Sequence, residues 1–376
     1  MVTLISTVYF SCIFTLGLYF FILAGANIAE IRRYTRHPAL NDGPLVSVLI
    51  PVRNEAAHIQ RCLDSLRHQT YPHYEILVLD DDSQDDTGVI LEQAAKADPR
   101  IRVFSGAPLP ADWYGKPYAL QQLAGYACGE ILIMTDADTV HSPSSIAFTV
   151  TNMAEADFIS GYVGQELRSF GEKITVPLMF FLTGFVIPLC LNRYTKWSAF
   201  SVAIGQFIAI RKEVFSRIGG FTRVRKRTSE DIYLARLVKA RGFTTRFLDL
   251  GDQVRCRMYV GYRSAMNGIG KNIFDFLGNH SAVLILVFWA VFFFLFLPFP
   301  LALALPWTLP TYRFQLLGTN LLYTLTWTML FVDRRLPWYY GLLWPLMMGN
   351  LLVTALWSWV RAVSGRGFTW KGRIVG

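Results

Sequence analysis

Residues 131–140 read ILIMTDADTV, an apolar run interrupted by Asp136 and Asp138. The uncharged part is typical of a buried strand, and the two acids follow where that strand should end. Side chains at positions i and i+2 of a strand point to one face, so this spacing would bring both carboxylates together. Buried like charges raise each other's pKa, and a bound divalent cation removes that penalty. The stretch therefore predicts a metal site, with an exposed turn of two solvated acids as the alternative.

The segment from residue 44 to about residue 250 alternates between strand-like and helix-like patterns. Strands are expected over 44–52, 74–81, 100–105 and 130–138, and helices over 55–69, 87–97 and 116–128. This rhythm predicts an α/β fold, with a mostly parallel sheet covered by helices on its faces. Ligands of such sheets bind beyond the carboxyl ends of the strands. The polar residues of the segment gather at those ends.

The apolar residues, which are 53% of the 376 residues, are concentrated near the two ends of the chain. Membrane-spanning helices are expected over residues 4–25, 281–306, 315–332 and 337–360. Three arginines follow the first span, which favours a cytosolic location for the residues after it. The sequence therefore predicts an integral protein of the cell (inner) membrane with a cytosolic catalytic domain.

Three regions are expected on this basis. They are an N-terminal anchor over 1–27, a cytosolic domain over 28–280, and a C-terminal transmembrane region with a basic tail over 281–376. The uncharged stretch 174–191 is expected to form a helix lying in the membrane interface, because the strand-helix domain continues after it; a fifth membrane span is the alternative. The net charge is +9, and residues 281–376 hold seven basic residues and one acid, so six of the nine excess charges lie beside the expected spans. The positive-inside rule and attraction to anionic lipids explain this placement, and no nucleic acid partner is expected.

Further charged residues stand at expected strand ends and helix starts. Asp80 and Asp81 end the second strand, where a carboxylate can accept hydrogen bonds from a nucleobase or ribose; an N-cap cluster is the alternative. Lys116 precedes a helix start, where its ammonium and the helix dipole both favour a diphosphate, unless it is simply solvated. Glu230 and Asp231 begin an amphipathic helix, in which they are either site residues or ordinary N-terminal acids.

The pieces IPVRNE, VLDDDSQDDT, GKPYAL, TDAD, IGGF and SED follow one another in this order. Taken together, they resemble the family 2 glycosyltransferases, which have a Rossmann-like GT-A fold, over residues 44 to about 275. The resemblance implies an inverting transfer of a sugar from a nucleotide-diphosphate sugar, with a UDP-sugar as the favoured donor. It also implies a divalent cation, Mg²⁺ or Mn²⁺, that binds the donor phosphates.

The resemblance also assigns roles by position. Asp231 corresponds to the catalytic base, Asp138 to the principal metal ligand, and Asp136 to a contact with the ribose or the metal. The remaining candidate contacts with the nucleotide or the diphosphate are Pro51, Asn54, Glu55, Asp80, Asp81, Lys116 and Glu230.

One departure from the family concerns its polymer-making branch, which carries Gln-x-x-Arg-Trp after the helix of the catalytic base. Residues 254–274 of this chain read VRCRMYVGYRSAMNGIGKNIF instead, and look more like enzymes that transfer one sugar to a carotenoid or hopanoid lipid. Arg257, Arg263 and Lys271 are candidate contacts with the diphosphate or the acceptor, although they could equally face lipid headgroups.

Several alternatives remain at this point. Within enzymes, the acceptor could be a polyprenyl phosphate, or the chain could be a polysaccharide synthase. A transporter is disfavoured because the charged residues of the C-terminal region lie between the expected spans. An inactive scaffold is disfavoured because the acids at 136, 138 and 231 are all present. His141 is either a further metal contact or a cap of the following helix, and Gln206 is a candidate contact with the acceptor.

Overall fold

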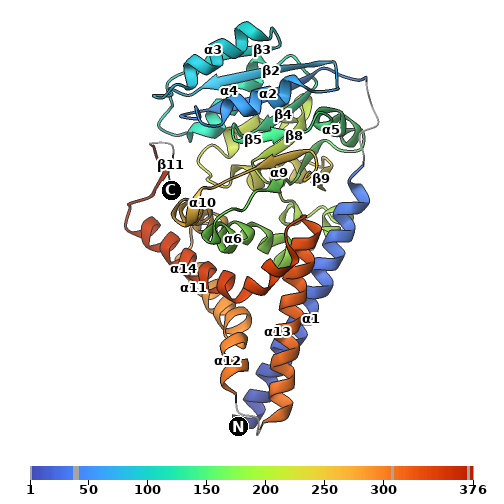
Figure 1. Ribbon diagram of the computed structural model, residues 1–376, viewed down its shortest axis with the longest axis vertical. Helices are drawn as coiled ribbons and strands as arrows, with labels where there is room; N and C mark the ends of the chain where they lie inside the picture. The colour runs from blue at the N-terminus through green and yellow to red at the C-terminus, as the bar shows by residue number, and fades with distance from the viewer. Residues whose placement is uncertain (1, 37–41, 306–308, 371–372, 376) are drawn as a thin grey trace.

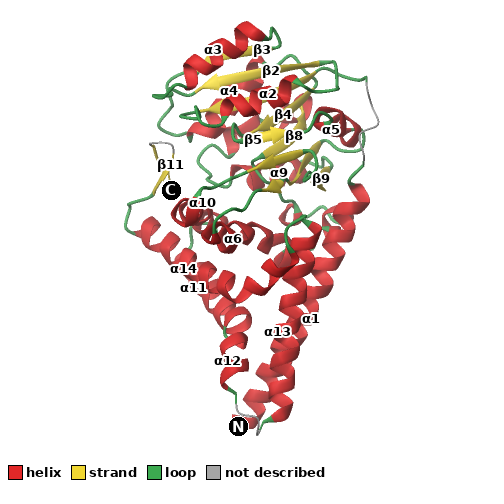
Figure 2. Cartoon of the chain, in the orientation of Figure 1, coloured by secondary structure: helices red, strands yellow, loops and turns green. Residues whose placement is uncertain are grey.

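A computed structural model describes residues 2–36, 42–305, 309–370 and 373–375. Figure 1 shows an α/β domain at one end of an elongated molecule and long helices at the other. The helices α1 (Val2–Tyr34), α12 (Pro298–Ala304) and α13 (Pro310–Asp333) converge toward the end that is remote from the sheet, as Figure 2 shows. A layer that contains α6 (Phe170–Thr175) and α10 (Gly261–Phe276) lies between the sheet and the long helices.

A seven-stranded sheet forms the centre of the α/β domain. Its order is β3(Ile101–Ser105)-β2(Tyr74–Asp80)-β1(Val46–Val52)-β4(Ile131–Thr135)-β8(Phe207–Arg211)-β6(Phe158–Tyr162)-β9(Thr245–Asp249). Only β8 runs against its neighbours among these strands, pairing antiparallel with both β4 and β6. The expected α/β fold with a mostly parallel sheet is therefore confirmed.

Helices cover the sheet on both faces. They are α2 (Ile59–Arg67), α3 (Thr87–Ala97), α4 (Gly115–Tyr126), α5 (Ser145–Met153), α8 (Lys212–Ile218) and α9 (Glu230–Ala240). Successive residues of β1 divide between two cores, because strand side chains alternate between faces. Val48 and Ile50 belong to one core, and Leu49 belongs to the other. This two-sided burial explains why the strands read as continuous apolar runs.

A small second sheet carries the residues that surround the TDAD stretch. Its order is β5(Thr139–His141)-β10(Val254–Cys256)-β7(Gly164–Gln165). Cys256 pairs with Thr139 on one side and with Gln165 on the other. The sheet thus brings residues from three distant parts of the chain to the end of β4.

The long helices are α1 (Val2–Tyr34), α11 (Ser281–Ala290), η5 (Val291–Phe296), α12 (Pro298–Ala304), α13 (Pro310–Asp333), η6 (Trp338–Leu343) and α14 (Trp344–Val363). Among the described residues, three segments are long and apolar enough to cross a membrane: Leu4–Tyr34, Ser281–Ala304 and Trp338–Val363. The expected fourth span, 315–332, lies within α13, whose polar residues lower its hydropathy. The expected domain boundary at residue 27 falls within α1.

The stretch 174–191 does not form the single interfacial helix that was expected. It lies in a succession of short elements: α6 (Phe170–Thr175), η1 (Val176–Phe180), η2 (Leu182–Val186) and α7 (Cys190–Tyr194). Asn27 of α1 binds this broken backbone, donating to the carbonyl oxygens of Thr183 and Ile187 and accepting from the Leu189 amide. Prolines at 177 and 188 explain the breaks, since proline cannot continue a helical hydrogen-bond ladder.

After α14, a short hairpin of β11 (Phe368–Trp370) and β12 (Arg373–Val375) follows. Lys371 of the expected basic tail lies outside the described residues.

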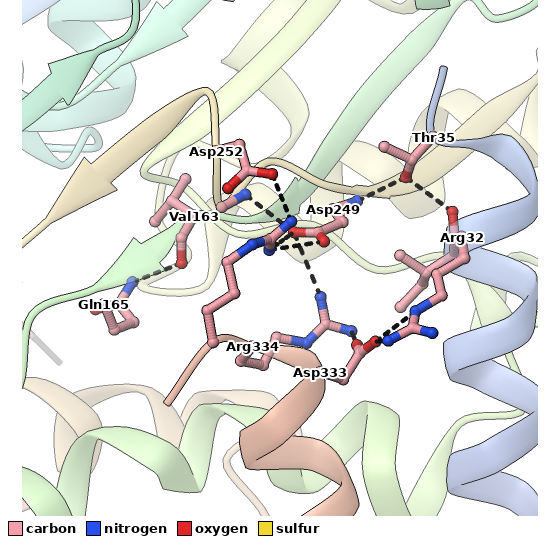
Figure 3. A network of polar contacts seen from close by, with 11 residues as sticks. Arg32, Thr35, Val163, Gln165, Asp249, Asp252, Asp333 and Arg334 are labelled. Carbon is pink, nitrogen blue, oxygen red and sulfur yellow. Dashed lines mark hydrogen bonds and ion pairs between the residues drawn. The ribbon is translucent and has the colours of Figure 1, made fainter. Parts of the chain in front are cut away.

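A network of charges joins the α/β domain to the ends of α1 and α13 (Figure 3). Asp333 and Arg334 form a buried pair at 2.7 Å, and Arg32 reaches Asp333 at 2.7 Å. Arg335 binds Asp249, at the end of β9, at 2.9 Å. The sheet is therefore tied directly to the long helices at this junction.

Candidate functional site

The two acids of TDAD lie in a tight turn and not in the strand. β4 ends at Thr135, and β5 begins at Thr139. The Thr139 hydroxyl donates to the Asp136 carbonyl oxygen at 2.7 Å, which fixes the turn. The explanation by strand spacing is therefore wrong. The carboxylates are nonetheless electrostatic neighbours, because the charge of Asp136 contributes to the raised pKa of Asp138.

Lys116 stands in the first turn of α4 and faces acids from two other elements. Its Nζ lies 2.6 Å from Asp136 Oδ1 and 3.9 Å from Glu230 Oε1, and it donates to the Gly205 carbonyl oxygen at 3.1 Å. Burial lowers the pKa of Lys116, but the attraction of these acids outweighs burial and holds that pKa above its ordinary value. The result is a cation held in place between carboxylates at the end of the sheet.

Glu230 and Asp231 occupy the first turn of α9. The Gly205 amide donates to Asp231 Oδ2 at 2.7 Å, and the Ile232 amide donates to Oδ1 at 2.8 Å, so the carboxylate is oriented by backbone groups. Burial raises the pKa of Asp231. Burial, with Asp231 as a further cause, also raises the pKa of Glu230 to about 7. Both carboxylates are therefore better proton acceptors than ordinary surface acids.

Asp138 combines burial with an unused oxygen. Burial, followed by the charges of Asp136 and Glu55, raises its pKa to about 7. The Cys256 thiol hydrogen-bonds its carboxylate, but Oδ1 is buried and has no partner among the residues that the structure describes. A buried carboxylate oxygen without a partner fits a divalent cation.

The described part of the chain contains no ready group of three or more His, Cys, Asp or Glu side chains that could enclose a metal. Asp136 and Asp138 together supply two carboxylates. This number suits Mg²⁺ or Mn²⁺ if phosphate oxygens of a ligand complete the coordination, which is the usual arrangement for Mg²⁺.

The loops after β1 and β2 are joined to each other. Asn54, which adopts a left-handed φ of 52°, accepts a hydrogen bond from the Gln84 amide at 2.8 Å. The Asp81 amide donates to the Val52 carbonyl oxygen at 2.9 Å. Asp80 accepts bonds from the amide and the hydroxyl of Ser83. Asp80 and Asp81 are not the N-cap of α3, because that position belongs to Asp86.

The other two predicted residues of this region, Pro51 and Glu55, lie beside these loops. Pro51 pairs with Leu79 in the β1–β2 ladder, and Glu55 follows Asn54 and is close enough to Asp138 to raise its pKa. The structure thus gathers the predicted nucleotide contacts at one edge of the sheet, next to the acids of TDAD.

The three basic candidates after β10 separate from one another. Arg257 binds buried Glu172 at 2.9 Å, and the Gly261 amide donates to the same carboxylate. Arg263 is exposed on α10 (Gly261–Phe276). Lys271, also on α10, lies within electrostatic reach of Lys116, Asp136, Glu230 and Asp231. Of the three, only Lys271 lies near the acid cluster, which consists of Asp136, Glu230 and Asp231.

Glu172 was not anticipated from the sequence. Although burial acts in the opposite direction, the hydrogen bonds from Arg257 and from backbone amides lower the pKa of Glu172 to about 2. Its local signal is Ser169-x-x-Glu172, a capping box: Ser169 is the N-cap of α6 and accepts from the Glu172 amide. Its bond to Arg257 has no local signal.

Gln206, the candidate contact with the acceptor, is buried and bonded within the protein. It donates to Cys256 Sγ at 3.0 Å and accepts from Gln165 at 2.9 Å, so its side chain supports Cys256. His141 is buried among Thr135, Thr139 and Ser145, and burial lowers its pKa to about 3. His141 Nδ1 lies 3.2 Å from the hydroxyl of Ser145, the first residue of α5, whereas the N-cap position of that helix belongs to Ser144.

Residues 47–219 match the family described as Glycosyl transferase family 2. A Bacillus subtilis protein named "Probable glycosyltransferase YdaM" is 27% identical over 208 residues, which are 54% of this chain and 49% of that protein. A Trichormus variabilis protein named beta-monoglucosyldiacylglycerol synthase is 35% identical over 97 residues, 25% of this chain and 20% of that protein. This chain thus spans half or less of the length of these relatives.

Among solved structures, a mannosyltransferase from Pyrobaculum calidifontis, in complex with GDP-Man and Mn²⁺, superposes with a TM-score of 0.58 at 20% identity. The likeness covers 97% of this chain and 100% of that one, so it extends from the sheet to the long helices. Together with the sheet order, this likeness shows an α/β fold of the GT-A type, in which residues 47–219 match the family 2 glycosyltransferases.

Proposed function

We propose that this chain is an inverting glycosyltransferase that moves a sugar from a nucleotide-diphosphate sugar, such as a UDP-sugar, to a hydroxyl of a membrane lipid. The observation that carries this proposal is the convergence of Lys116, Asp136, Glu230, Asp231 and Lys271 at the carboxyl end of the sheet. The two lysines suit the phosphates of a sugar donor, and the acids beside them suit removal of a proton from an acceptor.

Asp231 is the proposed general base. Its carboxylate is oriented by two backbone amides, and burial raises its pKa, which makes it a stronger base than an exposed aspartate. It would take the proton of the acceptor hydroxyl while that oxygen forms a bond to the anomeric carbon. The bond from that carbon to the diphosphate oxygen breaks on the opposite side, which inverts the centre.

The leaving diphosphate gains negative charge, and Lys116 is the proposed cation that stabilises it. Asp136 and Asp138 would hold a divalent cation, which when bound supplies further charge stabilisation to the diphosphate. The Mn²⁺ and GDP-Man in the Pyrobaculum mannosyltransferase support the choice of Mg²⁺ or Mn²⁺ as cations to test.

The acceptor is proposed to be a lipid such as a carotenoid or hopanoid because α10 connects the acids to an apolar helix. Lys271 lies within electrostatic reach of Glu230 and Asp231. The preceding residue, Gly270, contacts α14: its carbonyl oxygen accepts from the Ser358 hydroxyl at 2.6 Å. Only α10 is thus needed to connect the acids with α14. A lipid acceptor that lies along the long helices would therefore be one helix away from the acids.

The test is to incubate the full chain, purified in detergent, with radiolabelled nucleotide sugars and a total lipid extract, and then to identify the labelled lipid. Asp231→Asn should lower kcat for a hydroxyl acceptor by roughly 10²–10⁴-fold and leave donor binding unchanged. Glu213→Gln, a similar change on the exposed face of α8, is the control and should retain full activity.

A polyprenyl phosphate is already ionised and does not need a base. An Asp231→Asn variant that keeps most of its rate would therefore identify a phosphate acceptor. Failure of the unaltered protein to label any lipid, with every donor, would refute the proposed function.

A further inference from the structure

A cavity of about 260 Å³ lies where α1 meets the α/β domain. Its lining combines the end of α1 with α7, the last turn of α9 and the edge strand β9. Lys239, in the last turn of α9, contributes to it, whereas Glu230 and Asp231 stand in the first turn of that helix. The cavity is thus separate from the acid cluster.

The charged residues that line this cavity are unbalanced. Arg193, Lys239 and Arg246 bring three positive charges, and Glu30 brings one negative charge. Burial and then the charge of Arg193 lower the pKa of Arg246, and burial and then Arg246 lower the pKa of Lys239. The cations therefore repel one another, and a bound anion would relieve that repulsion.

The cations are held in place by neighbouring groups. The Arg246 guanidinium lies 3.8 Å from the centroid of the Tyr34 ring, and Arg193 donates a hydrogen bond to the Tyr34 hydroxyl. Lys239 Nζ donates to the Asn192 carbonyl oxygen at 2.5 Å. Side chains that are already ordered lose less entropy when they bind a ligand.

The segment beside the cavity has the composition of a membrane interface. Tyr194 and Trp197 are 67% and 70% exposed, and the exposed Lys196 lies between them. Tyrosine and tryptophan are enriched at the level of lipid headgroups. Tyr194 is the last residue of α7, and Lys196 and Trp197 follow that helix, which contacts the apolar helix α1. A membrane that surrounds α1 would therefore present its headgroups near this cavity.

We propose that Arg193, Lys239 and Arg246 form a binding site for a phosphate group, that of an anionic phospholipid headgroup or free phosphate. This site is additional to the donor site, and its occupation would hold the α/β domain against the bilayer surface. The fork of each guanidinium suits two phosphate oxygens at once. Because binding is measured without any sugar transfer, the proposal can fail or succeed independently of the proposed function.

The test measures binding to the full chain in a neutral detergent through its unfolding midpoint. The protein is titrated with short-chain phosphatidylglycerol, with short-chain phosphatidylcholine, and with inorganic phosphate. We expect phosphatidylglycerol to raise the midpoint much more than phosphatidylcholine. If inorganic phosphate raises the unfolding midpoint as much as phosphatidylglycerol does, the ligand of the site is free phosphate. Equal effects of the two lipids, without any effect of phosphate, would overturn the proposal.

Variants then assign the binding to these residues. Lys239→Gln and Arg246→Gln should each weaken phosphatidylglycerol binding by roughly fivefold. Lys96→Gln is the matched control, because Lys96 is exposed and occupies the last turn of α3 as Lys239 does in α9. If Arg246→Gln does not fold, Lys239→Gln decides alone. Binding by folded Lys239→Gln at the affinity of the unaltered protein would contradict the assignment.

Discussion

Asp138 Oδ1, a buried oxygen without a partner among the described residues, leads to the first prediction at the residue scale. Asp138→Asn should weaken Mn²⁺ binding by roughly 10–100-fold or more, because an amide replaces a charged ligand. Titration calorimetry of the purified chain with Mn²⁺ and a nucleoside diphosphate measures this. Glu213→Gln is the control. Unchanged Mn²⁺ affinity in Asp138→Asn would rule out the site at this carboxylate.

Glu230 allows a prediction on pH. Its pKa is about 7 in the folded chain and near 4.5 when unfolded, so the folded state binds the proton more tightly. Its contribution to stability is therefore fully present below about pH 4.5 and is lost as pH rises from there through about 7. Glu230→Gln mimics the protonated form. We expect its unfolding midpoint, relative to that of the unaltered protein, to be higher at pH 8.5 than at pH 5. A difference independent of pH would contradict the raised pKa.

At the scale of the element, α10 connects the acid cluster to the long helices, and its packing depends on a glycine. A Cβ at Gly268 would lie 2.1 Å from the ring of Tyr259, which is itself buried. Tyr259 cannot move easily, because the core around it includes Val176 and Ala265.

Gly268→Ala should therefore lower the free energy of unfolding by about 1–3 kcal/mol. Gly125→Ala, in the last turn of α4, is the control: its Cβ would meet no atom within 4 Å, so stability should stay equal or rise by up to about 1 kcal/mol. Thermal unfolding in detergent compares the two. Equal midpoints would mean that Tyr259 can yield.

At the scale of the whole molecule, the charged junction of Figure 3 joins the sheet to α1 and α13. Its side chains differ in exposure: Asp333 and Arg334 are 4% and 5% exposed, whereas Arg335 is 45% exposed. Because of this difference in exposure, we expect substitutions at the two positions to lower the free energy of unfolding by different amounts, although both remove a charge from the same network.

Asp333→Asn should destabilise the protein by about 3–5 kcal/mol, because it leaves the buried charge of Arg334 without its closest partner. Arg335→Gln breaks a more exposed pair with Asp249 and should cost only about 0–1 kcal/mol. Denaturant unfolding in detergent measures both. Equal losses of stability would show that burial at the junction does not set the cost.

How much the sequence predicts depends on the range of the interactions involved. The strands and helices up to β4 follow from apolar periodicity, because local spacing determines which side chains can face a sheet. Lys116, Asp136 and Glu230 could be proposed as one group because each stands at a strand end or helix start. Their distances depend on the pairing of β4 with β8, between residues far apart in sequence.

The sequence by itself determined the α/β fold, the apolar character of the ends and the acids that begin or end elements. Only the tertiary structure decided that Arg257 binds Glu172, that 174–191 is divided around Asn27, and that a cationic cavity forms between α1 and β9. The physical reason is that local propensity acts within a few residues. Ion pairs and cavities depend on which distant segments the packing of the core brings into contact.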